Sequence, residues 1–111
     1  MTISEAIEIS HKTAVSKGWW EKERSIPEVL ALIHSEVSEA LEEYRQERPL
    51  NGTYCKSITP LKPEGFTYEL ADILIRVFDL AGGLRLPLEE ALERKMKYNK
   101  TRPHRHGGKR A

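Results

Sequence analysis

Apolar side chains recur at helical spacing along much of the chain, and the first two stretches of this kind predict two amphipathic helices. The first runs from Ile3 to Lys17, and Gly18 follows where a helix would stop. The second runs from about Ile26 to about Glu47, with Ser25 and Glu28 at the positions of a capping box. Its apolar stripe consists of Val29, Leu30, Ile33, Val37, Ala40, Leu41 and Tyr44.

Two further helices are predicted after an irregular segment. Proline and glycine interrupt any periodicity from Arg48 to Gly65, which predicts a loop, and a loop this long in a small domain is often functional. The third helix begins near Phe66 or Thr67 and ends at Gly82 and Gly83. The fourth runs from Pro87 to about Asn99 and precedes an irregular basic tail from Arg102 to Ala111. The stripe of the third helix consists of Leu70, Ile73, Leu74, Val77, Phe78 and Ala81.

These patterns predict an all-α fold, a bundle of about four helices in a single domain over residues 1–111. No run of residues alternates with period two over a useful length, so a sheet is not expected. The apolar stripes of the two central helices are too wide for one neighbouring helix to cover. We therefore expect a homo-oligomer, either a dimer or a tetramer built as a dimer of dimers.

Composition and charge narrow the classes of function. Charged residues make up 32% of the chain, and the formal net charge of +1 argues against binding nucleic acid over the whole surface. The charges are uneven, with acids in the middle and bases at the end. No apolar stretch approaches the roughly 20 residues of a membrane span. With Cys55 as its only cysteine and no signal peptide at its start, the chain is expected to be cytoplasmic.

Two pairs of acidic residues are the strongest chemical signal. Glu36 and Glu39 are three positions apart on the second helix, and Glu69 and Asp72 repeat that spacing on the third. If the two helices pack antiparallel, four carboxylates converge on one point and their repulsion requires cations. Hard divalent cations, magnesium above all, take such oxygen ligands together with the phosphates of a substrate.

A single pair of this kind is usually only the solvated face of a charged helix. The second pair changes the balance, because Glu69 and Asp72 interrupt an apolar stretch and we expect both to be buried there. Buried acids destabilise a fold unless they are paired or bind something. A salt bridge from Arg76 to Asp72 is the competing explanation, and it leaves Glu69 unexplained.

The segment from Leu32 to Ala40, followed by the segment from Glu69 to Arg76, resembles the E-x-x-E and E-x-x-D signature of the MazG-like, all-α nucleoside triphosphate pyrophosphohydrolases. The basic run from Lys95 to Lys109 resembles the segment that closes the active site in that superfamily. The similarity extends from about His11 to Lys109. The 30 positions from Glu39 to Glu69 make the spacing long for the compact type.

The resemblance implies hydrolysis of a (deoxy)nucleoside triphosphate between its α and β phosphates, giving the monophosphate and pyrophosphate. It implies a role in removing non-canonical or excess nucleotides. Glu36, Glu39, Glu69 and Asp72 correspond to its magnesium ligands and catalytic residues, with Mn²⁺ as a substitute for Mg²⁺. Two or more ions per site are expected, and one glutamate, for which Glu39 is a candidate, would act as a general base through water.

Substrate-binding residues are predicted near the end of the chain and after the first helix. Lys95 and Asn99 share a helix face and Arg102 follows, so all three are candidates for contacting phosphate oxygens. A basic helix end that complements the helix dipole is an equal alternative. Trp20, or its neighbour Trp19, is a candidate for stacking on the base, and a role in the core or an interface is at least as well supported.

Two other classes of function compete with hydrolysis. A non-catalytic oligomeric module would bind nucleic acid or an acidic partner through the basic tail, and its affinity would fall steeply with salt. A di-iron or di-manganese bundle would need Glu-x-x-His pairs on two helices. None of the four histidines lies three positions after a glutamate, which counts against the second class.

Overall fold

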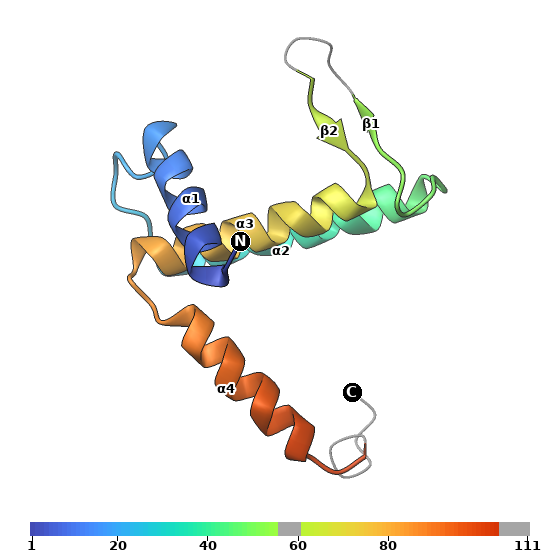
Figure 1. Ribbon diagram of the computed structural model, residues 1–111. Helices are drawn as coiled ribbons and strands as arrows, with labels where there is room; N and C mark the ends of the chain where they lie inside the picture. Colours follow the sequence, from blue (N-terminus) through green and yellow to red (C-terminus); the bar gives the residue numbers. More distant parts are fainter. Residues whose placement is uncertain (56–60, 105–111) are drawn as a thin grey trace.

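The computed structural model describes residues 1–55 and 61–104 and confirms the predicted all-α class. Its helices are α1 (Ile3–Ser16), α2 (Ile26–Arg45), α3 (Phe66–Gly83) and α4 (Leu88–Thr101), shown in Figure 1. Two short strands, β1 (Tyr54–Cys55) and β2 (Pro63–Glu64), lie between α2 and α3. Most of the predicted basic tail, from residue 105 onward, lies outside the described residues.

Side-chain caps set the starts of the first two helices. Ser25 is the N-cap of α2, and its hydroxyl accepts a hydrogen bond from the backbone N–H of Glu28 at 3.2 Å. A reciprocal capping box forms at the start of α1, where Thr2 and Glu5 each bond the other's backbone N–H. Of the capping box predicted at α2, the described hydrogen bonds include only the one accepted by the serine, whereas the capping box of α1 is complete.

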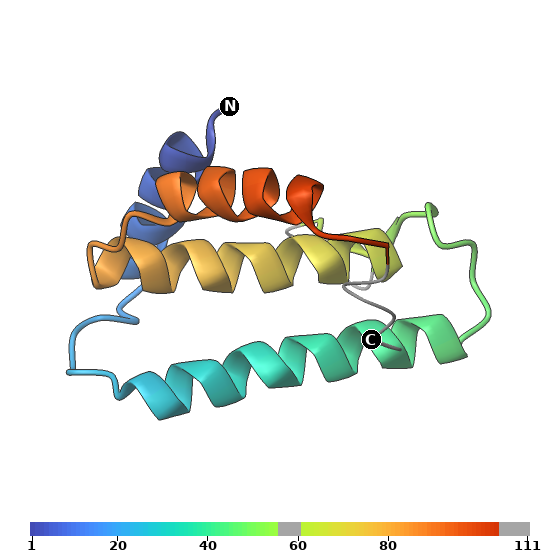
Figure 2. The same cartoon turned by 90° about the horizontal axis from the view of Figure 1, so that it is seen from below.

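The body of the molecule is an antiparallel pair of helices, α2 and α3. Helix α1 packs across the C-terminal end of α3 (Figures 1 and 2). Two glycines in the last turn of α3 allow α1 and the segment after it to approach closely. A Cβ on Gly82 would lie 2.7 Å from the Cβ of His11, and one on Gly83 would lie 2.2 Å from the Trp20 ring. The terminal glycines of α3 are therefore part of the packing as well as the stop signal.

The segment predicted as a loop, Arg48 to Gly65, contains an antiparallel hairpin, so the prediction that it has no strand was wrong. Tyr54 pairs with Glu64 and Cys55 pairs with Pro63. Strands of two residues are too short to produce an alternating pattern, which is why periodicity did not reveal them. The hairpin projects from the end of α3 where that helix begins (Figure 1).

The described chain buries little apolar material. The buried apolar residues among those described are Ala6, Val29, Ala40 and Ala81. Several large apolar side chains of the stripes predicted for α2 and α3 are exposed in the single chain instead of buried, namely Leu30, Val37, Leu41, Tyr44, Leu70 and Leu74. None of the described helices is long and apolar enough to cross a membrane.

Helix α4 lies apart from the α2–α3 pair. It packs against α1 near its first turns and then runs away from the other helices (Figure 1). The Cα radius of gyration is 16.6 Å, whereas a compact domain of this length has one of about 13 Å. The chain is therefore extended for its size, and α4 is the main cause.

Candidate metal centre

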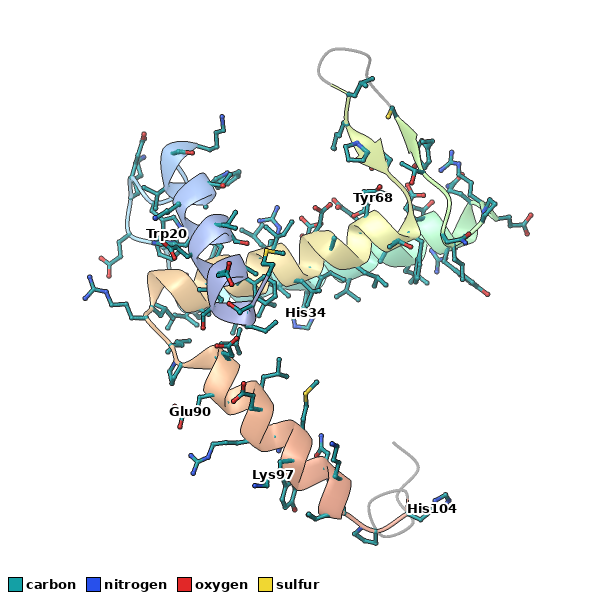
Figure 3. The ribbon with its side chains drawn as sticks, in the orientation of Figure 1. Trp20, His34, Tyr68, Glu90, Lys97 and His104 are labelled. Atoms are coloured by element: carbon teal, nitrogen blue, oxygen red, sulfur yellow. The ribbon has the colours of Figure 1, made fainter. Side chains whose placement is uncertain are left out.

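Carboxylates from α2 and α3 converge as the antiparallel packing predicted. Glu36, Glu69 and Asp72 each offer one carboxylate oxygen, and these three oxygens lie within 4.8 Å of one another. We call these three residues the central acidic group. In Figure 3 the carboxylate oxygens along α3 gather on the side of the helix pair that faces the hairpin, where Tyr68 is labelled, away from His34.

Glu36 is buried, although its pair with Glu39 resembles a solvated helix face in the sequence. Its side chain is only 9% exposed, and Arg76 Nε donates to its Oε1 at 2.5 Å. Arg76 therefore pairs with Glu36 on the facing helix. The competing explanation had assumed a salt bridge from Arg76 to Asp72 along α3. This ion pair links α2 to α3 at the edge of the central acidic group.

Glu69 is the most perturbed carboxyl of the group. Burial, followed by the charges of Asp72, Glu39, Glu36 and Glu64, raises the pKa of Glu69 from 4.5 to about 7. Its Oε2 is buried and has no hydrogen-bond partner among the described residues. A buried carboxylate oxygen without a partner is costly, and a bound cation would satisfy it.

Asp72 is exposed, so the burial predicted for it was wrong. It lies three residues after Glu69, and this rotation about the helix axis moves it to the rim of the group. Its pKa is nevertheless raised by desolvation, then by the charges of Glu36 and Glu64. An exposed carboxylate beside two buried ones gives the group an opening toward solvent.

Glu39 is the exposed fourth member of the predicted set. Desolvation and then the neighbouring Glu36 raise the pKa of its carboxyl. Among the described residues Arg76 is the one whose positive charge lowers it. Glu39 therefore borders the central acidic group, but it is not one of the three residues whose carboxylate oxygens lie within 4.8 Å of one another.

An apolar cavity adjoins the central acidic group. Its volume is about 560 Å³, which is within the range of small-molecule sites. Ile75, Phe78 and Trp19 contribute to its walls, and Glu36 and Asp72 line it as well. A ligand in this cavity can therefore place an apolar ring against α1 and α3 while its anionic end meets the acidic group through a cation.

Trp20, predicted to stack on a base, lies against the last turn of α3 (Figure 3). Its ring N–H donates to Asp79 Oδ1 at 2.8 Å, and the His11 ring packs against it edge-on. Trp19, which is 55% exposed, is the tryptophan that lines the cavity. A direct contact of Trp20 with substrate stays a prediction, while its contacts in the structure are with α1 and α3.

The predicted phosphate contacts of the last helix are not brought to the acidic group within one chain. Lys95 and Asn99 lie on α4, which runs away from α2 and α3 (Figure 1). Lys95 Nζ and the Arg102 guanidinium lie 5.6 Å and 5.7 Å from the ring centre of Tyr98. Their role toward phosphate stays a prediction.

The sequence reasoning missed a second set of acids beside the first. Glu43, Glu64 and Glu69 also offer oxygens within 4.8 Å of one another, and all three residues are buried. Glu43 was detectable, because it follows Glu39 by four positions on the same helix face. Glu64 carried no such signal, because it comes from a strand that periodicity did not reveal.

The acidic groups fit a hard divalent cation in the chemistry of their donors, all carboxylate oxygens, and in the unpartnered Oε2 of Glu69. Comparisons with known proteins add no family: no protein-family model matches the chain, and no curated protein or solved structure matches it either.

Proposed function

We propose that this protein is a magnesium-dependent nucleoside triphosphate pyrophosphohydrolase that releases pyrophosphate and a nucleoside monophosphate. The observation that supports this proposal most directly is that the central acidic group lies next to an apolar cavity of about 560 Å³. Nucleotides combine an apolar, stackable base with a polyanion, and they need both kinds of surface at one site. The resemblance of the two acidic motifs to the MazG-like superfamily supports the same conclusion.

Glu36, Glu69 and Asp72 would hold magnesium, with manganese as a substitute, and Glu39 would act beside them as the base instead of as a ligand. When bound, the metal supplies positive charge to offset the triphosphate and makes water a better nucleophile. Arg76 holds Glu36 in place from the opposite helix. The exposed opening at Asp72 is where the phosphates would enter.

Glu39 is the best candidate for the general base. It is exposed and lies beside the buried carboxylates, so it can accept a proton from a water bound next to the metal. In this role it accepts the proton of the water that attacks the α phosphorus. The bond from the α phosphorus to the bridging oxygen then breaks, and pyrophosphate leaves with that oxygen.

The base of the nucleotide would occupy the apolar cavity. Phe78 and Trp19 provide aromatic surface there, and Ile75 completes an apolar wall on α3. Polar groups of Ser10 and Thr13 on α1 line the same cavity and would contact the sugar or the base edge. The preferred base would follow from these side chains.

We propose in addition that the enzyme is a homo-oligomer. The exposed stripe on α2 and α3 and the projecting α4 leave a single chain with few buried apolar residues among those described. A second copy packed on that stripe would bury it. The α4 helix of one copy would then be able to bring Lys95, Asn99 and Arg102 to the acidic group of the other.

A product assay tests the proposed function. Purified protein is incubated with magnesium and a panel of ribo- and deoxyribonucleoside triphosphates, and pyrophosphate and orthophosphate are measured separately. We expect pyrophosphate from at least one nucleotide. Asp72→Asn and Glu39→Gln should reduce the rate by more than ~100-fold, because losing even an outer partner of a metal ligand costs about 10–100-fold.

Glu42→Gln is the matched control, because Glu42 is an exposed neighbour on α2 that contacts Arg45 and Gln46. It should retain the wild-type rate. Release of orthophosphate alone, or full turnover by Asp72→Asn, would refute the proposal. If no nucleotide is hydrolysed and removal of residues 102–111 abolishes salt-sensitive binding to nucleic acid, the non-catalytic alternative is supported instead.

A further inference from the structure

A second acidic group lies at the base of the hairpin, next to the central one. It joins Glu43 of α2, Glu64 of β2 and Glu69 of α3, which offer oxygens within 4.8 Å of one another. The three residues are 8%, 3% and 7% exposed. We call it the hairpin acidic group, and Glu69 is the residue that it shares with the central acidic group.

The backbone fixes Glu64 in this position. Gly65 follows it with a φ of 137°, and a Cβ at Gly65 would lie 2.6 Å from the carbonyl oxygen of Gly52. Thr67 Oγ1 donates to the carbonyl of Leu50 at 2.8 Å, which ties the other side of the hairpin to α3. The hairpin therefore closes onto the start of α3 and holds Glu64 against the helix pair.

Glu43 is oriented by two neighbours from the hairpin segment. The Tyr54 hydroxyl donates to Glu43 Oε1, and Arg48 Nη1 lies 3.3 Å from its Oε2. The Arg48 guanidinium also lies 4.2 Å from the centre of the Tyr54 ring. The hydroxyl bond raises the pKa of Tyr54, which keeps the donor protonated.

Two buried oxygens of the hairpin acidic group lack hydrogen bonds from the described residues, Glu64 Oε1 and Glu69 Oε2. Lys62 Nζ forms an ion pair with Glu64 Oε1 at 3.0 Å, and the Lys62 side chain is 68% exposed. Its ammonium can move into solvent. Glu69 has no cationic partner of this kind among the described residues, so the pairs with Lys62 and Arg48 do not offset all three carboxylates.

We propose that Glu43, Glu64 and Glu69 bind a divalent cation of their own, with Glu69 bridging it to the ion of the central acidic group. Oxygen ligands lie about 2.1–2.6 Å from such cations, so two ligands of one ion lie at most roughly 4–5 Å apart, and the 4.8 Å limit on these oxygens is compatible with that. The bound ion ties the hairpin to α2 and α3 and fixes the Glu69 side chain. This site does not depend on the proposed hydrolysis.

Counting bound Mn²⁺ without nucleotide tests the site. Electron paramagnetic resonance of free Mn²⁺, titrated past saturation into a fixed concentration of the protein, gives the number of ions per chain and their affinities. Glu64→Gln should bind one ion fewer per chain than wild type, whereas Asp72→Asn should keep the ion of the hairpin acidic group. Glu43→Gln should match Glu64→Gln, and the exposed neighbour Glu42→Gln should match wild type.

Thermal unfolding separates a cation site from a structural ion pair between Lys62 and Glu64. In EDTA, the melting temperature of Glu64→Gln should be at least that of wild type. It should be higher by about 4 °C if the relief of repulsion among the carboxylates exceeds the loss of the ion pair between Lys62 and Glu64. Added Mn²⁺ should raise the melting temperature of wild type more than that of Glu64→Gln. A melting temperature lowered in EDTA, with a metal-induced rise equal to that of wild type, would assign a structural role only.

An unchanged Mn²⁺ count in both Glu64→Gln and Glu43→Gln overturns the proposal. Circular dichroism at the temperature of the titration establishes that each variant is folded. Because no nucleotide is present, the result is independent of the product assay. A protein that binds this ion and releases no pyrophosphate would refute the proposed function alone, and the opposite pair of results would refute this site alone.

Discussion

Glu69 lies where the requirements of folding and of metal binding oppose each other. Its carboxyl is buried among four other acids and belongs to both acidic groups. Keeping it ionised without a cation destabilises the folded state, because the unfolded chain leaves the same charge in water. The binding of a cation therefore explains the buried position of Glu69 better than packing does.

The raised pKa of Glu69 predicts how stability changes with pH. Its folded pKa of about 7 exceeds the unfolded value of 4.5, so the folded state binds more protons between these two values. In EDTA the free energy of unfolding should therefore fall as pH rises from about 4.5 to about 7, by on the order of 1 kcal/mol after solvent screening. Urea unfolding across this range measures it.

Glu69→Gln is the companion variant. It should flatten that part of the pH profile and raise the stability of the metal-free protein at pH 8, while removing metal binding at both acidic groups. Magnesium should restore stability to wild type above pH 7, because it binds the ionised form. A pH profile of Glu69→Gln identical to that of wild type would rule out this account of Glu69.

At the residue scale the sequence predicted which acids meet, and it misjudged their burial. The spacing of Glu36 and Glu69 placed them on facing helices, which is what a helical period can determine. The period does not determine which edge of a stripe faces a neighbour. Glu36 is therefore buried where a solvated face was an option, and Asp72 is exposed where burial was expected.

At the scale of elements, Asp79 connects three parts of the fold. It accepts hydrogen bonds from the Trp20 ring at 2.8 Å and from Arg24 Nη1 at 3.3 Å, and it pairs with His11 Nδ1 at 3.0 Å. These partners come from α1 and from the segment between α1 and α2, while Asp79 itself lies on α3. The cavity of the candidate site lies between α1 and α3, so Asp79 holds its walls together.

Asp79→Ala should destabilise the protein by about 2–4 kcal/mol, because it leaves a largely buried arginine and an indole N–H without their acceptor. Urea unfolding followed by tryptophan fluorescence measures the loss. Glu8→Ala is the control, because it breaks only an exposed pair with Lys12 and should leave the stability close to that of wild type. Equal effects of the two variants would show that Asp79 has no special role.

The predictable elements are those that are long enough for a repeating apolar pattern to be recognised in the sequence. Four helices follow from apolar spacing and from stop signals such as Gly82 and Gly83, and their ends differ from the predictions by one or two residues. The hairpin could not be predicted from the sequence pattern, because its two-residue strands are held by backbone pairing and by the contact of Gly65 with Gly52. Glu64, and with it the hairpin acidic group, was hidden for the same reason.

At the scale of the whole molecule, the exposed apolar stripe sets the main expectation. Leu41 and Leu74 are about half exposed on neighbouring helices, and a contiguous apolar stripe of this kind usually marks an interface. The sequence predicted the width of the stripe but could not place α4. The direction of that helix depends on the short connection around Leu86, which carries no periodic signal.

Light scattering coupled to size exclusion should give a mass of at least twice the 12.8 kDa of one chain. Leu41→Lys combined with Leu74→Lys should shift the protein toward the monomer, because a buried lysine in an interface is strongly unfavourable. Leu61→Lys, at an exposed residue of the hairpin segment, is the control and should leave the mass unchanged. A wild-type protein that elutes and scatters as a single chain would contradict the expectation.

The position of the bond that is cleaved tests the central claim most directly. Wild-type protein is allowed to hydrolyse its best nucleoside triphosphate in water enriched with oxygen-18, and mass spectrometry locates the label in the products. Attack at the α phosphorus predicts one labelled oxygen in the nucleoside monophosphate and none in pyrophosphate. Label in pyrophosphate or in orthophosphate, with an unlabelled nucleotide product, would contradict the account.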